Sequence, residues 1–301
     1  MMTRNVMIKE NILIDGDILV YKVASAIEEP MDFGNDWWGL FADANEGYQQ
    51  IEWEIRKIIQ ELGAIQKWPT PEAESPSVEL SVRIVLSSSR NWRKQILPTY
   101  KANRANRVKP VLWNPLRDYL VEHHGAIIWD NLEADDVIGI LATSKTIIVS
   151  DDKDFLTVPC CLYQPNQVVA NKGKRIRKIT RKNADFQHLM QTLTGDRADG
   201  YQGCPGMGPV GASKALNLGI WREVVEAYEN AGLSEMDALV QARVSHILQR
   251  KSEYQQRTGE VRLWMPAAIE RIGKHDYTYE PRRIPNVPPE IVSECLESVP
   301  S

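Results

Sequence analysis

The chain has 301 residues, a mass of 34.2 kDa and a formal net charge of -4. This length suffices for one large domain or two modest ones with full apolar cores. No apolar run is long enough to cross a bilayer, and residues 1–11 lack the apolar segment of a secretory signal. The four cysteines form no Cys-x-x-Cys pair, which argues against a zinc site or disulfide framework and favours reduced thiols in a cytoplasm.

Short apolar runs rich in β-branched residues alternate with helical patterns along the first half of the chain. Such runs are typical of parallel strands that are covered on both faces. Between them, residues 48–62 carry isoleucine and leucine at spacings of three and four, which predicts a helix. The alternation predicts an α/β fold with a central, mostly parallel sheet. The predicted strands are Asn11–Asp15, Val82–Leu86, Ala126–Trp129 and Thr146–Ser150.

The pattern changes along the chain in ways that predict its domain organisation. Residues 28–46 are acidic and hold Trp37, Trp38 and Phe41, and we assign this segment no function. After Lys182 the pattern becomes mainly helical, and prolines accumulate after residue 266. We therefore expect an α/β domain in 1–182, a helical region in 183–265 and a C-terminal tail in 266–301.

Carboxylates gather where the predicted strands end. Ligands of open parallel sheets bind outside the carboxyl ends of the strands, so three acidic groups are expected to converge on one crevice. A further pair at helical spacing is expected to close over it. The groups are Asp15 with Asp17; Glu133 with Asp135 and Asp136; Asp152 with Asp154; and the helical pair Asp196 with Asp199.

Taken singly, each pair is better explained by a helix first turn or a capped turn. The whole set is not, because converging carboxylates repel one another and raise each other's pKa unless cations neutralise them. A ligand set of oxygen atoms suits a hard cation, Mg²⁺ or Mn²⁺. Two such ions are the usual arrangement for phosphodiester hydrolysis. The acidic residues therefore predict a metal site.

Two basic stretches without acidic residues predict contacts to nucleic acid phosphates. The first is Arg90–Lys109, which also holds Trp92 and Tyr100 as candidates for stacking on bases. The second is Lys172–Lys182. Solvated protein faces usually mix both signs of charge, so phosphate binding explains these stretches better than solvation alone.

A glycine-rich stretch at 203–215 contains a literal G-x-G-x-x-G at Gly206, Gly208 and Gly211. A dinucleotide-binding motif needs an apolar strand before it, whereas the preceding residues 196–202 are polar and acidic. A helix–hairpin–helix, in which a Gly-Pro-Gly turn leads into a helix N-terminus that holds a phosphate, fits better. A purely structural tight turn is the alternative.

In this order, these stretches resemble the flap endonuclease and 5′–3′ exonuclease family, most closely the stand-alone 5′–3′ exonucleases of short-tailed bacteriophages. The resemblance covers roughly residues 11–265. It is carried by LIDGD (13–17), NWRKQILPTYKANR (91–104), LEADDVIG (132–139), SDDKDF (150–155) and TGDRADGYQGCPGMG (194–208).

The resemblance implies a PIN-like fold with a helical arch at about 90–118 and a helix–three-turn–helix module. It implies hydrolysis at or near 5′ ends of duplex or branched DNA, such as nicks and flaps, and of RNA primers in RNA/DNA hybrids. It further implies two Mg²⁺ or Mn²⁺ ions, a potassium ion at the helix–hairpin–helix, replication proteins as partners and a host cytoplasm.

The resemblance also implies roles for individual residues. Lys101 and Arg104 are expected to contact the scissile phosphate, and Tyr100 is expected to stack on the terminal nucleotide. The predicted metal ligands are Asp15, Glu133, Asp135, Asp136, Asp152, Asp154, Asp196 and Asp199. The predicted DNA contacts are Arg93, Lys94, Tyr100, Arg107, Lys109, Gly206, Gly208 and Lys214.

One position departs from the family pattern and keeps alternatives open. The family usually has an Asp five residues before the arginine that is Arg93 here, and this chain has Ser88. A catalytically weakened DNA-binding homologue is therefore one alternative, and it predicts binding of branched DNA without cleavage. A PIN-type ribonuclease is another, and it predicts a preference for single-stranded RNA. A dinucleotide-dependent enzyme is the most distant.

Overall fold

The computed structural model describes residues 8–65, 78–167 and 176–266, and it divides into two compact units. Part of the second basic stretch, residues 172–175, and the tail after 266 lie outside the described residues. Within the described ranges, no helix has the length and apolar character needed to cross a membrane. Unit 1 holds residues 8–92, 106–188 and 246–262, and unit 2 holds residues 93–105, 189–245 and 263–266.

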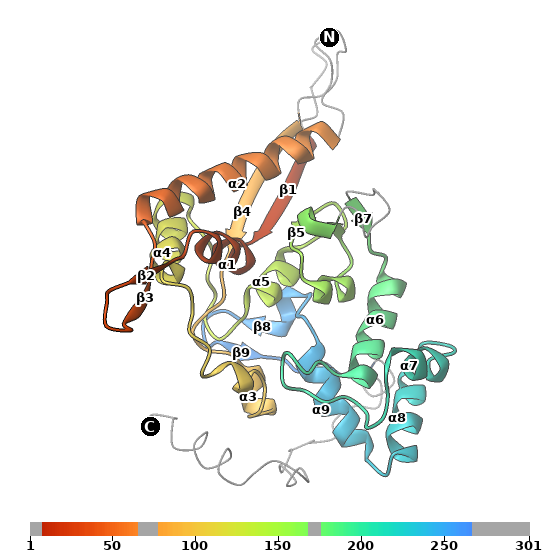
Figure 1. The fold of residues 1–301 in the computed structure, drawn as a ribbon. Helices are drawn as coiled ribbons and strands as arrows, with labels where there is room; N and C mark the ends of the chain where they lie inside the picture. The colour runs from red at the N-terminus through yellow and green to blue at the C-terminus, as the bar shows by residue number, and fades with distance from the viewer. Residues whose placement is uncertain (1–7, 66–77, 168–175, 267–301) are drawn as a thin grey trace, which may run out of the picture. The chain divides into compact units, whose positions relative to one another are not determined.

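A five-stranded sheet forms the centre of unit 1 (Figure 1). Its strand order is β4-β1-β5-β6-β7, and all neighbours are parallel except β6 and β7. This confirms the predicted α/β class with a mostly parallel sheet. The strands are β1 Ile8–Asp15, β4 Val78–Val85, β5 Ile147–Val149, β6 Cys161–Tyr163 and β7 Ile176–Lys178.

The sheet differs from the prediction at its third strand and at one edge. Residues 126–129 do not form a strand, because only Ile127 makes a β-bridge, a parallel one to Val85. The strands β6 and β7 were not predicted, because their sequences, CLY and IRK, are not β-branched apolar runs. The equally short β5 has the sequence IIV, which is such a run.

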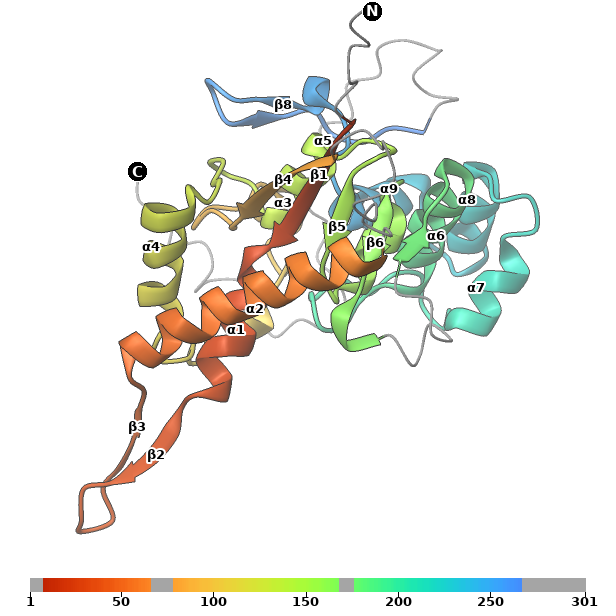
Figure 2. The ribbon, with the colours of Figure 1, turned by 90° about the horizontal axis from the view of Figure 1, so that it is seen from above.

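Helices cover both faces of this sheet. The helices α1 (Gly16–Ala26), α2 (Ala44–Ile65) and α4 (Trp113–His124) surround one apolar core with Ile12 and Ile14 of β1. Helix α2 contains the predicted helix at 48–62 and extends it at both ends. Figure 2 shows α5 (Ala134–Leu141) on the other side of β1 and β4.

Smaller elements complete unit 1. The segment 28–46, whose function was not predicted, contains an antiparallel hairpin between α1 and α2, formed by β2 (Glu29–Asp32) and β3 (Trp38–Phe41). The remaining elements are η2 Lys153–Thr157, η3 Pro165–Gln167, the start of α6 (Arg181–Thr194), η4 Lys251–Glu253, β8 Tyr254–Gln255 and β9 Glu260–Val261.

Unit 2 is helical, as predicted for the second half of the chain. Its core contains Leu97, Tyr100, Tyr201, Val240 and Val244. Besides the end of α6, it holds α3 Arg93–Ile96, η1 Ala102–Arg104, α7 Pro209–Ala215, α8 Trp221–Asn230 and α9 Glu235–Ser245.

The stretch predicted to form the arch, 90–118, contains the helical segments α3 and η1 and the start of α4, and the arch itself stays a prediction. One expectation about local structure was wrong. Asp196 and Asp199 lie in a turn rather than on a helix: the backbone N–H of Asp199 donates to the carbonyl of Asp196 at 3.2 Å. Gly195 and Gly200 flank this turn with φ of 65° and 75°, values that interrupt a helix.

Candidate active site

Asp15 lies where β1 passes into α1, and the residue is 7% exposed. One oxygen accepts a hydrogen bond from the backbone N–H of Ile18 at 3.3 Å, which caps the helix. The other accepts one from the hydroxyl of Ser150 at 2.9 Å. Ser150 directly follows β5, the parallel neighbour of β1, so the ends of these two strands are joined through Asp15.

The environment of Asp15 disfavours its charged form. Burial, followed by the negative charges of Asp17 and Asp152, raises the pKa of the Asp15 carboxyl from 3.8 to about 7. The hydrogen bonds from Ser150 and Ile18 act in the opposite direction and do not compensate. A cation beside these carboxylates would favour the charged form. The electrostatics of this strand end therefore fit a metal ion.

Asp152 and Asp154 follow β5 as predicted. Asp152 caps η2, because its Oδ1 accepts a hydrogen bond from the backbone N–H of Asp154 at 2.9 Å. Its own N–H donates to the Ser150 hydroxyl at 3.1 Å. Ser150 therefore contacts both Asp15 and the Asp152 loop. Asp152 and Asp154 are both half-buried.

The acidic group of α5 divides into two kinds of residue. Glu133 precedes the helix and Asp135 lies in its first turn, and both are half-buried. Asp136 is 0% exposed, and its two oxygens accept hydrogen bonds from Trp92 Nε1 at 3.0 Å and from the backbone N–H of Leu248 at 3.1 Å. These contacts favour a structural role for Asp136 over metal ligation. Trp92 is 2% exposed, so its ring does not offer a stacking surface either.

Asp17 is held by groups from two other elements. Its carboxylate forms an ion pair with Arg117 of α4 and accepts a hydrogen bond from the backbone N–H of Ser87 at 2.9 Å. The Ser87 hydroxyl in turn accepts one from the N–H of Ala134 at 2.9 Å, in the first turn of α5. This network was not predicted, since Ser87 and Arg117 carry no motif that distinguishes them from other surface serines and arginines.

The donor chemistry fits a hard cation, but the full predicted convergence is not seen. Asp15, Glu133, Asp135, Asp152 and Asp154 offer oxygen atoms only, which suits Mg²⁺ or Mn²⁺. Among residues 8–65, 78–167 and 176–266, no three His, Cys, Asp or Glu side chains lie close enough together to hold a metal ion. In unit 1 the charges of Asp17 and Asp152 act on Asp15. The full set of metal ligands stays a prediction.

Unit 2 gathers the predicted phosphate-binding cations around one carboxylate. Asp199 forms an ion pair with Arg104 and lies 3.6 Å from Lys101 Nζ. The Tyr100 hydroxyl also donates to the Asp199 carboxylate at 3.3 Å, and the backbone N–H of Lys101 donates to the Asp199 carbonyl at 2.8 Å. Asp196 instead accepts a hydrogen bond from the N–H of Ala198 at 2.8 Å within the turn.

The predicted DNA contacts differ in exposure. Arg93 is 1% exposed and donates from Nε to the carbonyl of Val244 at 2.8 Å, so the structure contradicts its prediction as a DNA contact. Tyr100 is 3% exposed, which leaves no open ring face for a nucleotide. The other predicted contacts, Lys94, Arg107, Lys109, Gly206, Gly208 and Lys214, are exposed. Gly208 caps α7, with Pro209 at its first position.

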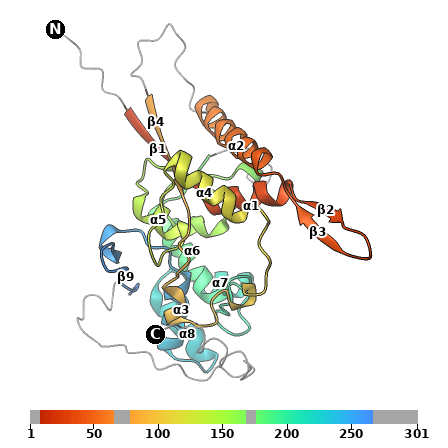
Figure 3. The same cartoon turned by 90° about the vertical axis from the view of Figure 1, so that its left-hand side faces the viewer.

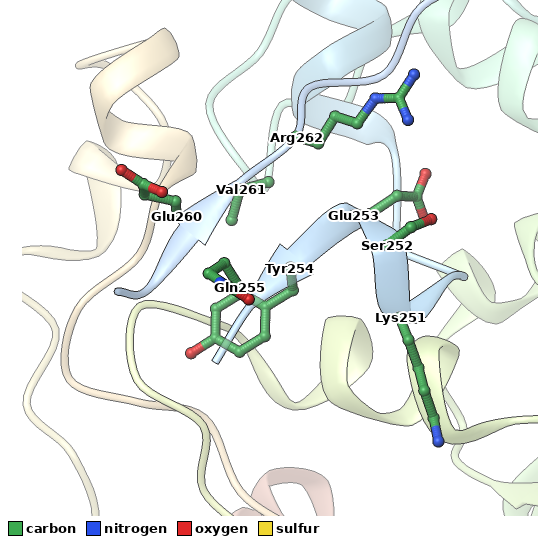
Figure 4. Close-up of a pocket in the computed structure, with 8 residues that line it drawn as sticks. All are labelled: Lys251, Ser252, Glu253, Tyr254, Gln255, Glu260, Val261 and Arg262. Carbon is green, nitrogen blue, oxygen red and sulfur yellow. The ribbon is translucent and has the colours of Figure 1, made fainter. Parts of the chain in front are cut away.

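Unit 1 also has an open hollow. It has a volume of about 610 Å³ and is lined entirely by residues 251–262 of η4 and the β8–β9 hairpin (Figure 4). Figure 4 shows the Lys251 and Tyr254 side chains pointing in different directions, with no gathering of like charges. None of the predicted site residues lines this hollow.

Comparison with known proteins settles the class of this chain. No family model matches it. The exonuclease of Escherichia phage T7 is 30% identical over 297 residues, which cover 85% of this chain and 93% of the phage protein. The chain belongs to the 5′–3′ exonuclease and flap endonuclease family. It is therefore a phosphodiester hydrolase, as the sequence predicted.

Other similarities agree with this family. The exodeoxyribonuclease of Enterobacteria phage T3 is 29% identical and covers 85% of this chain and 92% of its own length. The flap endonuclease Xni of Shewanella piezotolerans is 33% identical, over 46% of this chain and 58% of its own length. The T5 D15 protein, crystallised with metal ions, superposes with a TM-score of 0.50 at 15% identity over 78% of this chain and 88% of that protein, which shows the shared fold.

Membership of this nuclease family also settles the distant alternative. The G-x-G-x-x-G begins in the turn before α7 and ends within that helix, and residues 195–205 before it form no strand, only an isolated bridge between Asp196 and Tyr201. A dinucleotide-binding motif requires a strand at that place. The dinucleotide-enzyme hypothesis was therefore wrong.

Proposed function

We propose that this nuclease hydrolyses phosphodiester bonds at or near the 5′ ends of duplex or branched DNA, including nicks and flaps, and removes RNA primers from RNA/DNA hybrids. Family membership supports the class of reaction. One observation carries the site: Asp15, buried at the end of β1, has its pKa raised to about 7 by burial and by the neighbouring carboxylates of Asp17 and Asp152. A cation bound beside this carboxyl group would favour its charged form.

Two Mg²⁺ or Mn²⁺ ions are the proposed cofactors. In unit 1 the proposed ligands are Asp15, Glu133, Asp135, Asp152 and Asp154, whose half-buried or buried carboxylates follow strands or open α5. Asp196 and Asp199 of unit 2 remain predicted ligands on the sequence resemblance alone. When bound, the ions supply Lewis-acid polarisation of the phosphate and activation of water.

Lys101 and Arg104 are the proposed contacts of the scissile phosphate. Both now share the carboxylate of Asp199 as their counter-ion. A phosphate that binds Lys101 and Arg104 would take the place of the Asp199 carboxylate. Because both cations already contact an anion, little further water has to be removed from them. They would stabilise the charge that develops on the phosphate oxygens during hydrolysis.

Exposed residues outside this phosphate site are proposed to contact the rest of the DNA. We propose that Lys94, Arg107, Lys109 and Lys214 contact backbone phosphates, since all four side chains are exposed. Gly206 and Gly208 would hold the uncut duplex, with a potassium ion, in a helix–hairpin–helix. We further propose that the protein acts in a host cytoplasm together with replication proteins.

The experiment uses a 5′-flapped duplex and a nicked duplex, each labelled internally. Incubation in Mg²⁺ should give short products from the 5′ side on a denaturing gel, and EDTA should abolish them. The double variant Asp152→Asn/Asp154→Asn should bind both substrates and lose cleavage by at least about a hundredfold. Asp118→Asn, an exposed carboxylate of α4, is the matched control and should cleave normally. Undiminished turnover of the double variant would contradict the metal assignment.

A second candidate is a DNA-binding protein with weakened catalysis, and one observation favours it. Ser88 occupies the usual ligand position, and its backbone N–H donates to the carbonyl of Leu132 at 2.9 Å while its hydroxyl accepts from the N–H of Arg90 at 3.2 Å. A hydroxyl in these bonds does not replace a carboxylate ligand. Binding of both substrates without any product in Mg²⁺ or Mn²⁺ would establish this candidate, and Ser88→Asp should then restore cleavage.

A further inference from the structure

The β2–β3 hairpin exposes large apolar side chains without covering them. It extends away from α1 and α2 in Figures 2 and 3. Trp37 is 76% exposed and Trp38 is 66% exposed. Every residue of β2 is exposed, and in β3 only Gly39 is partly covered. The other exposed apolar side chains of the hairpin are Met31, Phe33, Leu40 and Phe41. Uncovered patches of this kind mark interaction sites in natural proteins.

Both faces of the hairpin are apolar. In an antiparallel pair, directly opposed residues point to the same face and successive residues alternate. The opposed pairs Pro30 with Leu40 and Asp32 with Trp38 therefore share one face. Met31 lies opposite Gly39 on the other face, beside Phe41. A flat surface could cover only one of these faces, whereas the two walls of a groove would cover both.

The hairpin is built to hold its shape before any partner binds. The N–H of Phe33 donates to the Trp37 carbonyl at 2.8 Å, and Gly34 takes a φ of 81° to make the tip. The Phe33 ring lies over Gly39, where an added Cβ would come within 2.9 Å of a ring carbon. At the base, the Glu28 carboxylate accepts a hydrogen bond from the N–H of Val111. An arm ordered in advance loses less entropy on binding.

The charge of the segment selects the kind of partner. Residues 28–46 contain only acidic charges, and no Lys or Arg occurs between Lys22 and Arg56. The acidic residues of this segment are Glu28, Glu29, Asp32, Asp36, Asp43 and Glu46. Such a segment repels nucleic acid phosphates and anionic lipid surfaces, and it attracts basic protein surfaces.

We propose that the β2–β3 hairpin is a docking arm for a protein partner whose surface offers an apolar groove with Lys and Arg side chains along its rim. The aromatic side chains on both faces fill the groove, with Trp37 at the tip and Trp38 within the arm as its anchors. The carboxylates around them, such as Asp32 and Asp36, pair with the basic rim. Aromatic anchors surrounded by a polar rim are the arrangement that gives most binding energy at protein interfaces.

The test uses a displayed library of small three-helix domains, each randomised along the groove between two helices. Binders are selected on the full-length protein, with counter-selection on Trp37→Ala/Trp38→Ala. Trp53→Ala, an exposed tryptophan of α2 outside the hairpin, is the matched control. All variants should keep wild-type cleavage of a nicked duplex, which shows that they are folded.

The expected result is a pool of binders enriched in Lys and Arg at the groove rim and in apolar residues at its floor. Their affinity should fall at least about tenfold with the double variant, remain within about twofold with Trp53→Ala, and weaken in high salt. A pool without hairpin-dependent binders, or without basic enrichment, would overturn the proposal. A change in DNA affinity in the double variant would also overturn it, because the hairpin would then bind DNA. A dimer in sedimentation that the double variant abolishes would overturn it as well, because the hairpin would then bind a second copy of the chain.

Discussion

Arg117 joins the carboxylate of Asp17 to the end of β4. Its Nη1 pairs with Asp17 Oδ1, and its Nη2 donates to the carbonyl of Ser87 at 2.6 Å. Asp17 lies two residues after Asp15, and Ser87 holds the N-terminus of α5 through Ala134. A single guanidinium of α4 thus fixes two of the segments that carry the proposed metal ligands, which makes Arg117 a positioning residue.

We expect Arg117→Met to lower the free energy of unfolding by about 2–3 kcal/mol, because it leaves the mostly covered Asp17 carboxylate unpaired. It should also lower kcat for cleavage more than it changes KM, since the loss lies in the geometry of the ligands. Arg117→Lys should recover part of both, because an ammonium restores the charge but not the two-pronged contact. Urea unfolding and steady-state kinetics measure these effects. Equal losses in Arg56→Met, an exposed arginine of α2, would contradict the assignment.

The raised pKa of Asp15 predicts a pH-dependent effect on stability in EDTA. Below pH 3.8 the carboxyl is protonated in both folded and unfolded chains, so it contributes no difference. As the pH rises from there to about 7, the unfolded chain ionises first and the folded state loses stability, and above pH 7 this penalty is complete.

Asp15→Asn should therefore stabilise the protein in EDTA at pH 8, by roughly 1–3 kcal/mol, and have little effect near pH 4. The same substitution should abolish stabilisation by added Mg²⁺. Thermal unfolding across pH 4–8, with and without Mg²⁺, measures both. A gain that does not grow with pH would show that the carboxyl is not held in its neutral form.

Asp136 is expected to stabilise the fold and not to bind metal. Asp136→Asn places an amide N–H₂ among hydrogen-bond donors, so the free energy of unfolding should fall by about 2–4 kcal/mol. At a temperature where the variant is folded, its Mn²⁺ affinity measured by calorimetry should stay within about threefold of wild type. Trp92→Phe, which removes the indole donor to Asp136, should show a smaller loss of stability and the same Mn²⁺ affinity. A large loss of Mn²⁺ affinity in either variant would restore Asp136 as a ligand.

The pairing of Asp199 with Lys101 and Arg104 predicts opposite effects on binding and cleavage. Asp199→Asn frees both cations, so duplex DNA should bind about threefold more tightly in EDTA, with a steeper dependence on salt. Arg104→Ala should weaken binding and slow cleavage. Fluorescence anisotropy in EDTA and single-turnover cleavage in Mg²⁺ separate the two. Weaker binding by Asp199→Asn would mean that Asp199 orients the cations instead of competing with the phosphate.

Much of the fold could be predicted because its signals are local. The strands at 11–15, 82–86 and 146–150 are short apolar runs rich in β-branched residues, and α2 shows helical spacing over several turns. The turn at 196–199 was mistaken for a helix because a spacing of three fits both. Its flanking glycines, Gly195 and Gly200, were the available signal, since their positive φ ends helical geometry.

The sequence by itself determined the family, the sheet and the acidic residues at its strand ends, because motifs and alternation depend on neighbours along the chain. Only the tertiary structure decided which carboxylates are buried and which groups they bind. Asp136 receives its hydrogen bonds from Trp92 and Leu248, 44 and 112 residues away, and Asp17 receives its ion pair from Arg117, 100 residues away. Burial and pairing between such distant residues depend on how the elements pack, and no local pattern encodes them.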